Sequence, residues 1–482
     1  MRSSTTTQLT IVTVLTIGTG SIVGVTKLLQ ILATTTGGRF ETTSESIAEE
    51  FLVSFGLAKA ISNVIAGAIS DTRGRRICML LGWLFGALFS LSILFCGSWS
   101  AVVACDLLLG INQALCWSAA LFVAHDLLGP TRRGVASGLV EASGYAAIAL
   151  SSPIVDAIGL RGFVGMHVVL LCVCVGCALL TIALRETKAA ASSSNAIGPR
   201  ASDNGASAAA DARTAVLEWP SGRREVVSSV RMAYAHASCL DGGLMACCLI
   251  GLCLNLATAY AWGAMSRWLA QYRIDSGDAA GGLSVGSVLL LYSIPKGVLQ
   301  LPAGRLADTR ACCGIGAAGL VILGVLINAC VLLIFAGLTT LADHDALPLG
   351  SAVYFAAPLA FLLGAGTALA YSPVMACVAY RADPSWRASA LGAYRFWRDA
   401  GYAIGAIILG GSADSVGGSL WLAPLLAAAA LLVAAGIFAK VYTYGGPVHV
   451  WSQHALAALD SATTTAAAVE VEMAVDDGAR DP

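Results

Sequence analysis

Two lysines stand deep inside apolar stretches of this sequence. Lys59 lies in LAKAISNVIAG and Lys296 in LLYSIPKGVLQ, and each precedes by twelve residues an aspartate, Asp71 or Asp308, near the end of its stretch. Because a helix rises 1.5 Å per residue, each ammonium group would lie roughly 18 Å from the end of its helix. In a bilayer that depth is near the midplane, where an unpaired charge costs about 2.5–3.5 kcal/mol or more. Both lysines are therefore candidates for binding or coupling.

The composition is that of a membrane protein. The 482 residues are 57% hydrophobic and 12% charged, with a mean hydropathy of +0.77, whereas soluble domains carry about 25% charged residues. The net charge of −1 argues against a nucleic acid partner. Apolar runs of about 20 residues, the length that crosses a bilayer, predict twelve spanning helices. They cover 9–32, 47–69, 77–97, 100–124, 134–158, 163–184, 243–266, 282–303, 312–340, 352–379, 388–411 and 419–441.

The distribution of arginine and lysine predicts how these helices are oriented. The segments on the same side as the N-terminus carry most of these residues. The segments on the opposite side carry only Arg39, Arg161, Arg267 and Arg273. Positive charge marks the cytoplasmic side of a membrane protein. We therefore expect both termini in the cytoplasm, with the protein in the plasma membrane or an organelle membrane.

The segment 186–242 differs in kind from the spans around it. Its stretch KAAASSSNAIGPRASDNGASAAADAR is small, polar and aperiodic, so it cannot bury enough apolar surface to fold alone. We predict a largely disordered cytoplasmic linker that joins two six-helix halves, residues 1–185 and 243–443. The tail, residues 444–482, is acidic and is also predicted to be disordered.

The two halves contain an internal repeat. The first copy reads KAISNVIAGAISDTR from Lys59, and the second reads KGVLQLPAGRLADTR from Lys296, so lysine, amide, Ala-Gly and Asp-Thr-Arg recur at an offset of 237 residues. Parallel repeats of this kind imply a pseudo-twofold axis along the membrane normal. Such transporters bind their substrate near the midplane, between the halves.

The first copy ends in GAISDTRGRR, which resembles the signature loop G-x-L-a-D-r-x-G-r-k of the major facilitator superfamily. The matching residues are Gly67, Asp71, Gly74, Arg75 and Arg76. The second copy keeps Gly304 and Asp308. The resemblance covers the whole membrane part and is closest to a poorly characterised group of members, through stretches such as FGLAKAISNVIAG. It implies an all-α membrane fold, with twelve transmembrane helices in two pseudo-symmetric six-helix bundles.

The resembled fold packs the second helix against the eleventh and the fifth against the eighth. Asp399 is then about 18 Å into its helix, level with Lys59, and Glu141 is about 12 Å in, within reach of the Lys296 side chain. We predict two ion pairs, Lys59–Asp399 and Lys296–Glu141. They are either structural locks that break as the halves rock, or proton sites at which a carboxylate takes up a proton and releases its lysine.

Two arginines of the eleventh helix add positive charge. Arg395 is four residues before Asp399 and is placed to pair with it along the helix, which leaves Arg398 either to face a substrate anion or to act structurally. The balance of core charges leans cationic and favours an anionic or zwitterionic substrate. Further candidates for the wall of the cavity are Asn112, Gln113, Asn255 and Trp262.

The resemblance assigns a gating role to the signature loop. Gly67 permits close helix approach, and Asp71 meets the positively polarised start of the eleventh helix near Pro384–Ser385. Arg75 and Arg76 then hold the cytoplasmic gate.

Enzyme chemistry finds no support in the sequence. No GKS or GKT phosphate loop, Ser-His-Asp set or HExxH pattern is present, and the cysteines lie within apolar runs without metal-ligand spacing. We predict no enzyme activity, no cofactor and no metal site. The protein is expected to be a monomeric secondary active transporter that moves a small solute by alternating access, coupled to protons. Two alternatives stay open, namely drug-type efflux of lipophilic compounds and a non-transporting sensor with the same fold.

Overall fold

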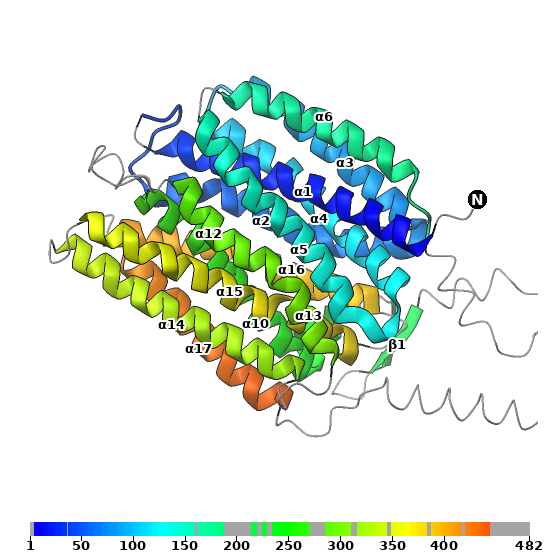
Figure 1. Cartoon of the computed structure of the whole chain (residues 1–482). Coiled ribbons are helices and arrows are strands. Elements are labelled where there is room, and N and C mark those ends of the chain that lie inside the picture. Colours follow the sequence, from blue (N-terminus) through cyan, green and yellow to red (C-terminus); the bar gives the residue numbers. More distant parts are fainter. Residues whose placement is uncertain are drawn as a thin grey trace, which may run out of the picture.

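The computed structural model describes residues 4–35, 37–159, 162–187, 214–218, 224–228, 234–269, 285–309, 316–344, 349–382, 387–416 and 420–443. These residues form a bundle of long helices, with α1–α6 gathered on one side and α10–α17 on the other (Figure 1).

The first half contains six long helices. They are α1 (Thr5–Thr34), α2 (Glu45–Arg73), α3 (Arg75–Ser92), α4 (Trp99–Leu128), α5 (Arg133–Ile158) and α6 (Phe163–Ile182), with short turns η1 (Ile93–Phe95) and η2 (Pro130–Arg132). Serine caps begin three of them, since Ser4, Ser44 and Ser98 each accept a hydrogen bond from a backbone N–H of the first turn. Gly74, at a φ of 103°, makes the sharp turn between α2 and α3.

The second half repeats this plan. It contains α10 (Gly242–Trp262), α12 (Val285–Val298), α13 (Gln300–Asp308), α14 (Ala317–Asp343), α15 (Leu349–Arg381), α16 (Arg387–Ser415) and α17 (Leu422–Phe438), with the turns η4 (His236–Leu240) and η6 (Ala439–Thr443) at its two ends. After a break at Gly263, α10 continues as a helix to Leu269. Helices α12 and α13 form one span that is broken at Leu299, four residues after Pro295.

Twelve spans were predicted, and the described residues contain twelve when α12 and α13 are counted together. Ten of these helices are long and apolar enough to cross a membrane on composition alone. The other two are the broken span and α16, which carries Arg395, Arg398 and Asp399. The predicted all-α membrane fold is therefore confirmed.

The two halves meet along two seams. Helix α2 packs along α16, and α5 packs along α12 and α13, which is the arrangement expected from the family resemblance. The starts of α1, α3 and α5 lie at the end of the bundle near β1, together with the end of α13 (Figure 1). We call this end the linker face. The end that holds the starts of α2 and α4 is the opposite face.

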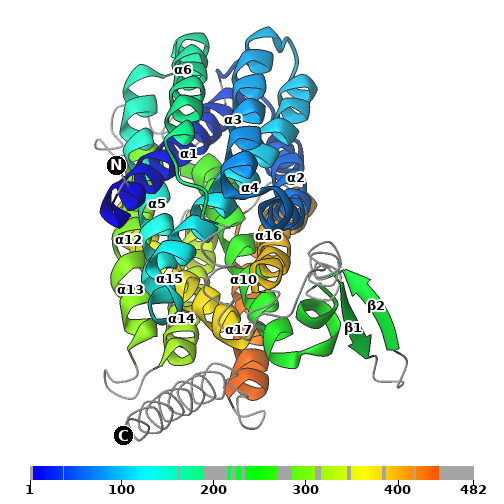
Figure 2. The ribbon, with the colours of Figure 1, turned by 90° about the vertical axis from the view of Figure 1, so that its right-hand side faces the viewer.

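Part of the segment 186–242, which was predicted to be a largely disordered linker, lies among the described residues. Strands β1 (Thr214–Glu218) and β2 (Arg224–Ser228) pair antiparallel, with Thr214 opposite Ser228 and Glu218 opposite Arg224, and stand beside the linker face (Figure 2). Valine occurs in both TAVLE and REVVS, and β-branched residues of this kind favour strands. The stretch 188–213 and the tail 444–482 lie outside the described residues.

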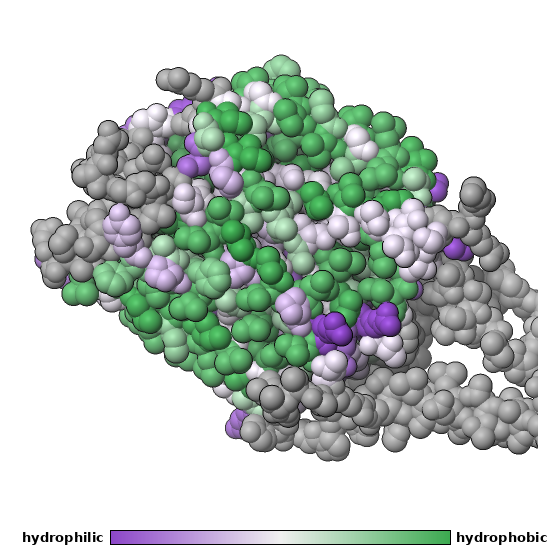
Figure 3. Space-filling model, in the orientation of Figure 1, coloured by the Kyte–Doolittle hydropathy of each residue, from purple (hydrophilic) through white to green (hydrophobic). Residues whose placement is uncertain are grey.

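The outer surface of the bundle is apolar. Green, hydrophobic residues cover most of the visible face between the two ends, and a cluster of strongly polar residues lies toward the linker face (Figure 3). Large side chains that point outward include Leu150, Leu179, Phe355, Ile407 and Val433. A surface of this kind is solvated by lipid rather than water. The chain is an integral, multi-pass membrane protein.

Candidate functional site: a charged central cavity between two gates

A cavity lies between the halves, with an empty volume of about 470 Å³. Five aromatic side chains, three cations and one carboxylate line it. These residues are Phe55, Trp117, Tyr145, Trp262, Tyr402, Lys27, Lys59, Arg398 and Glu141. Aliphatic side chains of α1, α2 and α5 complete the wall. An apolar pocket with a few convergent charges is the usual form of a small-molecule site.

Asp399 is the centre of the first charge network. Its carboxylate accepts two hydrogen bonds from the neighbouring Arg398, at 2.9 and 3.2 Å, and further bonds from the amides of Asn63 at 2.7 Å and Asn255 at 2.9 Å. The Lys59 ammonium lies 3.8 Å away. The predicted Lys59–Asp399 pair is therefore present across the α2–α16 seam. Asn63 was not among the predicted site residues, although the repeat had singled out its amide.

Glu141 has different partners from those predicted. Trp117 Nε1 donates a hydrogen bond to it at 3.2 Å, and the guanidinium groups of Arg398 and Arg395 lie at 3.6 and 3.9 Å. Among the described residues, no ion pair joins Glu141 to Lys296 within 4 Å. The predicted pair was wrong because residue spacing gives depth along a helix but not the direction in which a side chain points.

The predicted pairing of Arg395 with Asp399 was also wrong. Asp399 is already surrounded by Arg398, Lys59 and two amides. Arg395 instead donates from Nε to Asn63 Oδ1 at 3.3 Å and approaches Glu141. Arg398, expected to lack a local partner, therefore binds one carboxylate closely and lies near a second.

Lys296 occupies a cage of tyrosines. Its ammonium donates to Tyr292 Oη at 3.0 Å and to Thr258 Oγ1 at 3.3 Å, and it stands 4.3 Å from the ring centre of Tyr145 and 5.0 Å from that of Tyr371. Lys296 is fully buried. Aromatic faces stabilise a buried cation in part, but the charge itself is not neutralised by a carboxylate within 4 Å in the described part of the chain.

A further buried pair was missed by the sequence analysis. Lys27 of α1 lies 3.5 Å from Asp106 of α4, and Gln30 donates to the same carboxylate at 2.8 Å. The Lys27 ammonium also stands 4.2 Å from the centre of the Phe55 ring. A single lysine within the first apolar run was the available signal, but it has no counterpart in the internal repeat.

Around the cavity, buried cations outnumber buried carboxylates. The described residues supply five buried cations and three buried carboxylates, which leaves a formal surplus of two positive charges. The cations are Lys27, Lys59, Lys296, Arg395 and Arg398, and the carboxylates are Asp106, Glu141 and Asp399. Several donors also lack a hydrogen-bond acceptor among the described residues. They are Arg395 Nη1 and Nη2, Arg398 Nη1 and Tyr371 Oη.

The polar residues predicted to line the cavity divide into two groups. Trp262 lines it, and Asn255 holds Asp399 beside it. Asn112 and Gln113 are not part of the wall. Asn112 donates to the Gly82 carbonyl of α3 at 2.8 Å, and Gln113 donates to the Thr19 carbonyl of α1 at 2.9 Å. These two amides hold α4 against its neighbours, which corrects the prediction.

At the linker face, the second signature copy forms a latch between the halves. Asp308, the last residue of α13, accepts hydrogen bonds from the backbone N–H groups of Gly134 at 2.7 Å and Val135 at 2.9 Å, at the start of α5. Tyr380 donates to the same carboxylate at 2.6 Å. Gly304 lies so close to α5 that a Cβ there would be 2.1 Å from the Gly134 carbonyl oxygen. The latch therefore needs a glycine at that position.

The first signature copy is organised around Arg75 and Glu186. Arg75 pairs with Asp126 at 3.1 Å and donates to the Ser70 carbonyl at 2.7 Å. Glu186 accepts from the backbone N–H groups of Arg75 and Arg76, across the positive-φ turn at Gly74. Gly67 is buried in α2. The predicted contact between the Asp71 side chain and Pro384–Ser385 lies outside the described residues.

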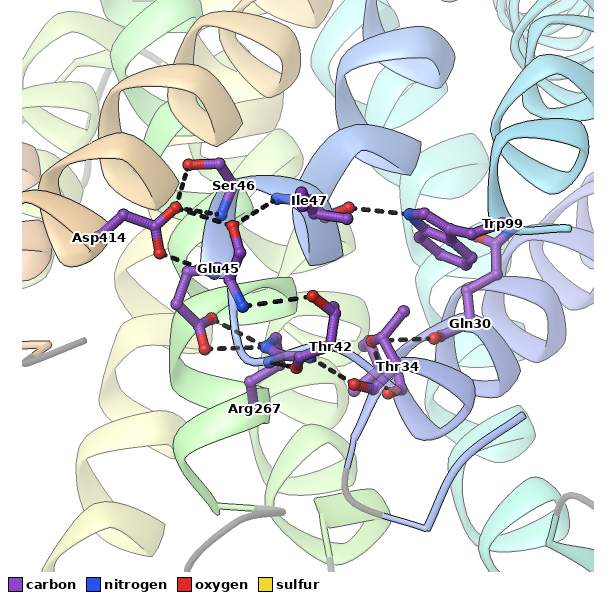
Figure 4. Close-up of polar contacts among 11 residues, drawn as sticks. Gln30, Thr34, Thr42, Glu45, Ser46, Ile47, Trp99, Arg267 and Asp414 are labelled. Carbon is purple, nitrogen blue, oxygen red and sulfur yellow. Dashed lines mark hydrogen bonds and ion pairs between the residues drawn. The ribbon is translucent and has the colours of Figure 1, made fainter. Parts of the chain in front are cut away.

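A second set of contacts joins the halves at the opposite face (Figure 4). Arg267 pairs with Glu45 at 2.9 Å and donates to the carbonyl oxygens of Thr34 and Thr42, both at 3.0 Å. Asp414 of α16 accepts from the backbone N–H groups of Glu45 at 2.9 Å and Ser46 at 3.1 Å. None of these residues was a predicted site residue. We call this set the opposite-face gate.

Comparisons with known proteins agree with this architecture. The family model described as Major Facilitator Superfamily matches residues 9–406, so the chain belongs to the major facilitator superfamily and is a membrane transporter rather than an enzyme. A solved structure of the human organic anion transporter MFSD10 (TETRAN) is similar at a TM-score of 0.63 and 16% identity, over 91% of this chain and all of that one. At this identity the likeness shows the fold alone. No curated protein matches the chain.

Proposed function

We propose that this transporter carries small organic anions by alternating access, coupled to protons, through the central cavity. The observation that carries the proposal is the surplus of buried positive charge, five cations against three carboxylates, around an aromatic-lined space. Buried charge is costly unless it is paired, so a bound anion would relieve the surplus. The donor atoms of Arg395, Arg398 and Tyr371 that lack a hydrogen-bond acceptor among the described residues would supply its hydrogen bonds.

The aromatic wall favours an anion with a flat apolar body. Phe55, Trp117, Tyr145, Trp262 and Tyr402 surround the space in which that body would lie. The similar solved structure is that of an organic anion transporter, which is consistent with the proposal for this chain.

The two gates fit alternating access. The Asp308 latch joins the halves at the linker face, and the Arg267 and Asp414 contacts join them at the opposite face. Rocking of the halves would break one set while the other holds. Because the arginine distribution favours a cytoplasmic linker face, the opposite face would be the extracellular or luminal side, with both termini in the cytoplasm.

The experiment uses three probes that share a benzene ring and differ in charge. Benzenesulfonate is an anion, benzenesulfonamide is neutral and benzyltrimethylammonium is a cation. Thermal unfolding of the purified protein with each probe reports binding, because a ligand at 100 times its Kd stabilises the folded state by about 2.7 kcal/mol. We expect benzenesulfonate to raise the Tm in the wild type and to lose this effect in Arg398→Gln and Lys296→Gln.

Arg305→Gln is the matched control, since it removes one positive charge from an exposed position of α13. It should leave the effect of benzenesulfonate unchanged. Counterflow of radiolabelled benzenesulfonate into proteoliposomes then tests transport itself. If the neutral and cationic probes stabilise the protein and the three variants bind them equally well, the anion proposal is refuted and drug-type efflux takes its place.

The described part of the chain offers the sensor alternative no specific support. A sensor needs a folded cytoplasmic element, and β1 and β2 supply two strands of five residues each. An isolated hairpin of that size is marginally stable at best.

A further inference from the structure

Glu49 of α2 is a buried carboxylate without a hydrogen bond. Its side chain is 0% exposed, and in the described part of the chain neither Oε1 nor Oε2 has a hydrogen-bond partner. The backbone N–H of Ala264 faces the carboxylate without meeting the geometry of a hydrogen bond. Asp106 also has a free oxygen, but its other oxygen is bonded to Gln30. Glu49 is therefore set apart from the other buried carboxylates described.

The surroundings of Glu49 are acidic on balance. The charged groups that face it are Glu45 on α2, Arg267 on the continuation of α10, and Asp414 on α16. Arg267 is already engaged, since its Nε lies 3.0 and 2.9 Å from the two oxygens of Glu45. An ionised Glu49 would thus be a third carboxylate beside one cation, in a place that water does not reach.

Gly263 makes room for this side chain. A Cβ on Gly263 would lie 2.1 Å from Glu49 Oε1, so the carboxyl group fills the space that a larger residue would take. The helix of α10 is interrupted at the same residue. Glu49 therefore packs against the break in α10, directly beside the turn that carries Arg267.

A buried carboxylate that is neither paired nor hydrogen-bonded is unstable as an anion. The closed arrangement of the opposite-face gate consequently requires the neutral acid at position 49. Release of that proton would place a negative charge against Gly263 and in competition with Glu45 for Arg267. Because a buried anion without a partner is costly, water must reach the carboxylate, and this hydration separates α2 from α10 and opens the gate.

We propose that Glu49 is a proton-binding site and that the opposite-face gate closes when this site is occupied. The reaction is simple, since the carboxylate takes one proton from water on the opposite face and returns it there when the gate opens. The transport consequence rests on the proposed function, but the protonation of Glu49 does not. In a cycle of alternating access, a gate that closes with a proton bound makes transport depend on pH at that face.

The first measurement is infrared spectroscopy of the full-length protein in liposomes. A protonated carboxyl group gives a carbonyl stretch that an ionised one lacks. At neutral pH the wild type should show one such band that is missing from Glu49→Gln. Glu50→Gln is the matched control because Glu50 is the neighbouring residue and is exposed, so that variant should keep the band. A band that survives in Glu49→Gln overturns the proposal.

The second measurement is the pH profile of benzenesulfonate counterflow, with pH varied on the opposite face. One proton per closure predicts a rate that falls about tenfold per pH unit above the titration point of Glu49. Glu49→Gln, a permanent mimic of the neutral acid, should give a flat profile, and Glu50→Gln should follow the wild type. A profile that Glu49→Gln does not flatten overturns the gating role.

The infrared and counterflow measurements distinguish failure of the proposed function from failure of the Glu49 proposal. If the wild type does not transport benzenesulfonate, the proposed function fails for this probe, while the infrared result still decides whether Glu49 holds a proton. Glu49→Asp guards against misfolding of the amide variant, because it keeps a titratable group and should shift the profile rather than flatten it. An Asp variant with a flat profile would also contradict the proposal.

Discussion

The contacts of Asp308 allow us to predict how much the latch stabilises the closed linker face. Asp308→Ala removes the acceptor for the N–H groups of Gly134 and Val135 and for Tyr380. Loss of an N-terminal cap costs about 0.5–2 kcal/mol, and loss of the favourable charge at the helix start costs about 0.3–1 kcal/mol more. Together these give about 1–3 kcal/mol, which is a factor of about 5 to 150 in the equilibrium between closed and open linker face.

Hydrogen exchange of the intact protein, measured by mass spectrometry, tests this prediction. The peptide that contains Gly134 and Val135 should exchange about 5 to 150 times faster in Asp308→Ala. Tyr380→Phe removes one bond only and should give a smaller change, since one hydrogen bond is worth about 0.5–1.5 kcal/mol. Asp414→Ala, the matched change at the other gate, should instead expose Glu45 and Ser46. If exchange at the start of α5 is the same in Asp308→Ala and wild type, the latch does not hold this face closed.

The cavity and the latch support three further predictions. Asp399→Ala leaves Arg398 and Lys59 buried without their main carboxylate. It should destabilise the protein by about 3–5 kcal/mol, as measured by thermal unfolding. A change below about 1 kcal/mol would contradict the charge network around Asp399. Lys296→Met should change the free energy of unfolding by less than about 1 kcal/mol, because no carboxylate among the described residues loses its partner. Binding of benzenesulfonate should weaken at least about tenfold. Unchanged binding would show that Lys296 is not part of the binding site. Gly304→Leu should hold the linker face open, since its side chain would overlap the Gly134 carbonyl, and normal protection of α5 in hydrogen exchange would show that the close approach is dispensable.

Depth in the membrane could be predicted from the sequence, and it identified one ion pair correctly. Lys59 lies twelve residues before Asp71 and Asp399 lies twelve residues after Arg387, and the resembled fold places their helices side by side. The same arithmetic failed for Lys296 and Glu141. A helix turns by 100° per residue, so spacing does not say whether Glu141 faces α12 or, as the structure has it, Trp117 and the arginines of α16.

The residues that sequence analysis missed have roles that arise from contacts between distant helices, and such contacts leave no recognisable pattern in the sequence. Glu49 lies in SESIAEE, where acidic residues at a helix start are ordinary. Its isolation becomes visible only once Gly263 and Arg267 are placed against it. Asp414 binds backbone N–H groups of α2, and backbone donors carry no sequence identity. The signature copy at Asp308 could be predicted because the family resemblance marks it.

Both gates are held by a carboxylate that caps the start of a helix in the other half. At the linker face Asp308, at the end of α13, caps the start of α5, and at the opposite face Asp414, near the end of α16, caps the start of α2. In both cases the second half supplies the carboxylate and the first half supplies the helix start. When either gate opens to water, the freed carboxylate and N–H groups are solvated, so the net cost is small.

Breaking the charge network around Asp399 costs more free energy than opening either gate. Asp399 is fully buried between α2 and α16, and breaking its pairs would leave buried charges that each cost several kcal/mol. We therefore expect the contacts at the two ends to alternate while the Asp399 network persists through the cycle as a pivot. On this reasoning an anion that enters the cavity engages the surplus donors of Arg395 and Arg398 without dismantling the pair that holds α2 to α16.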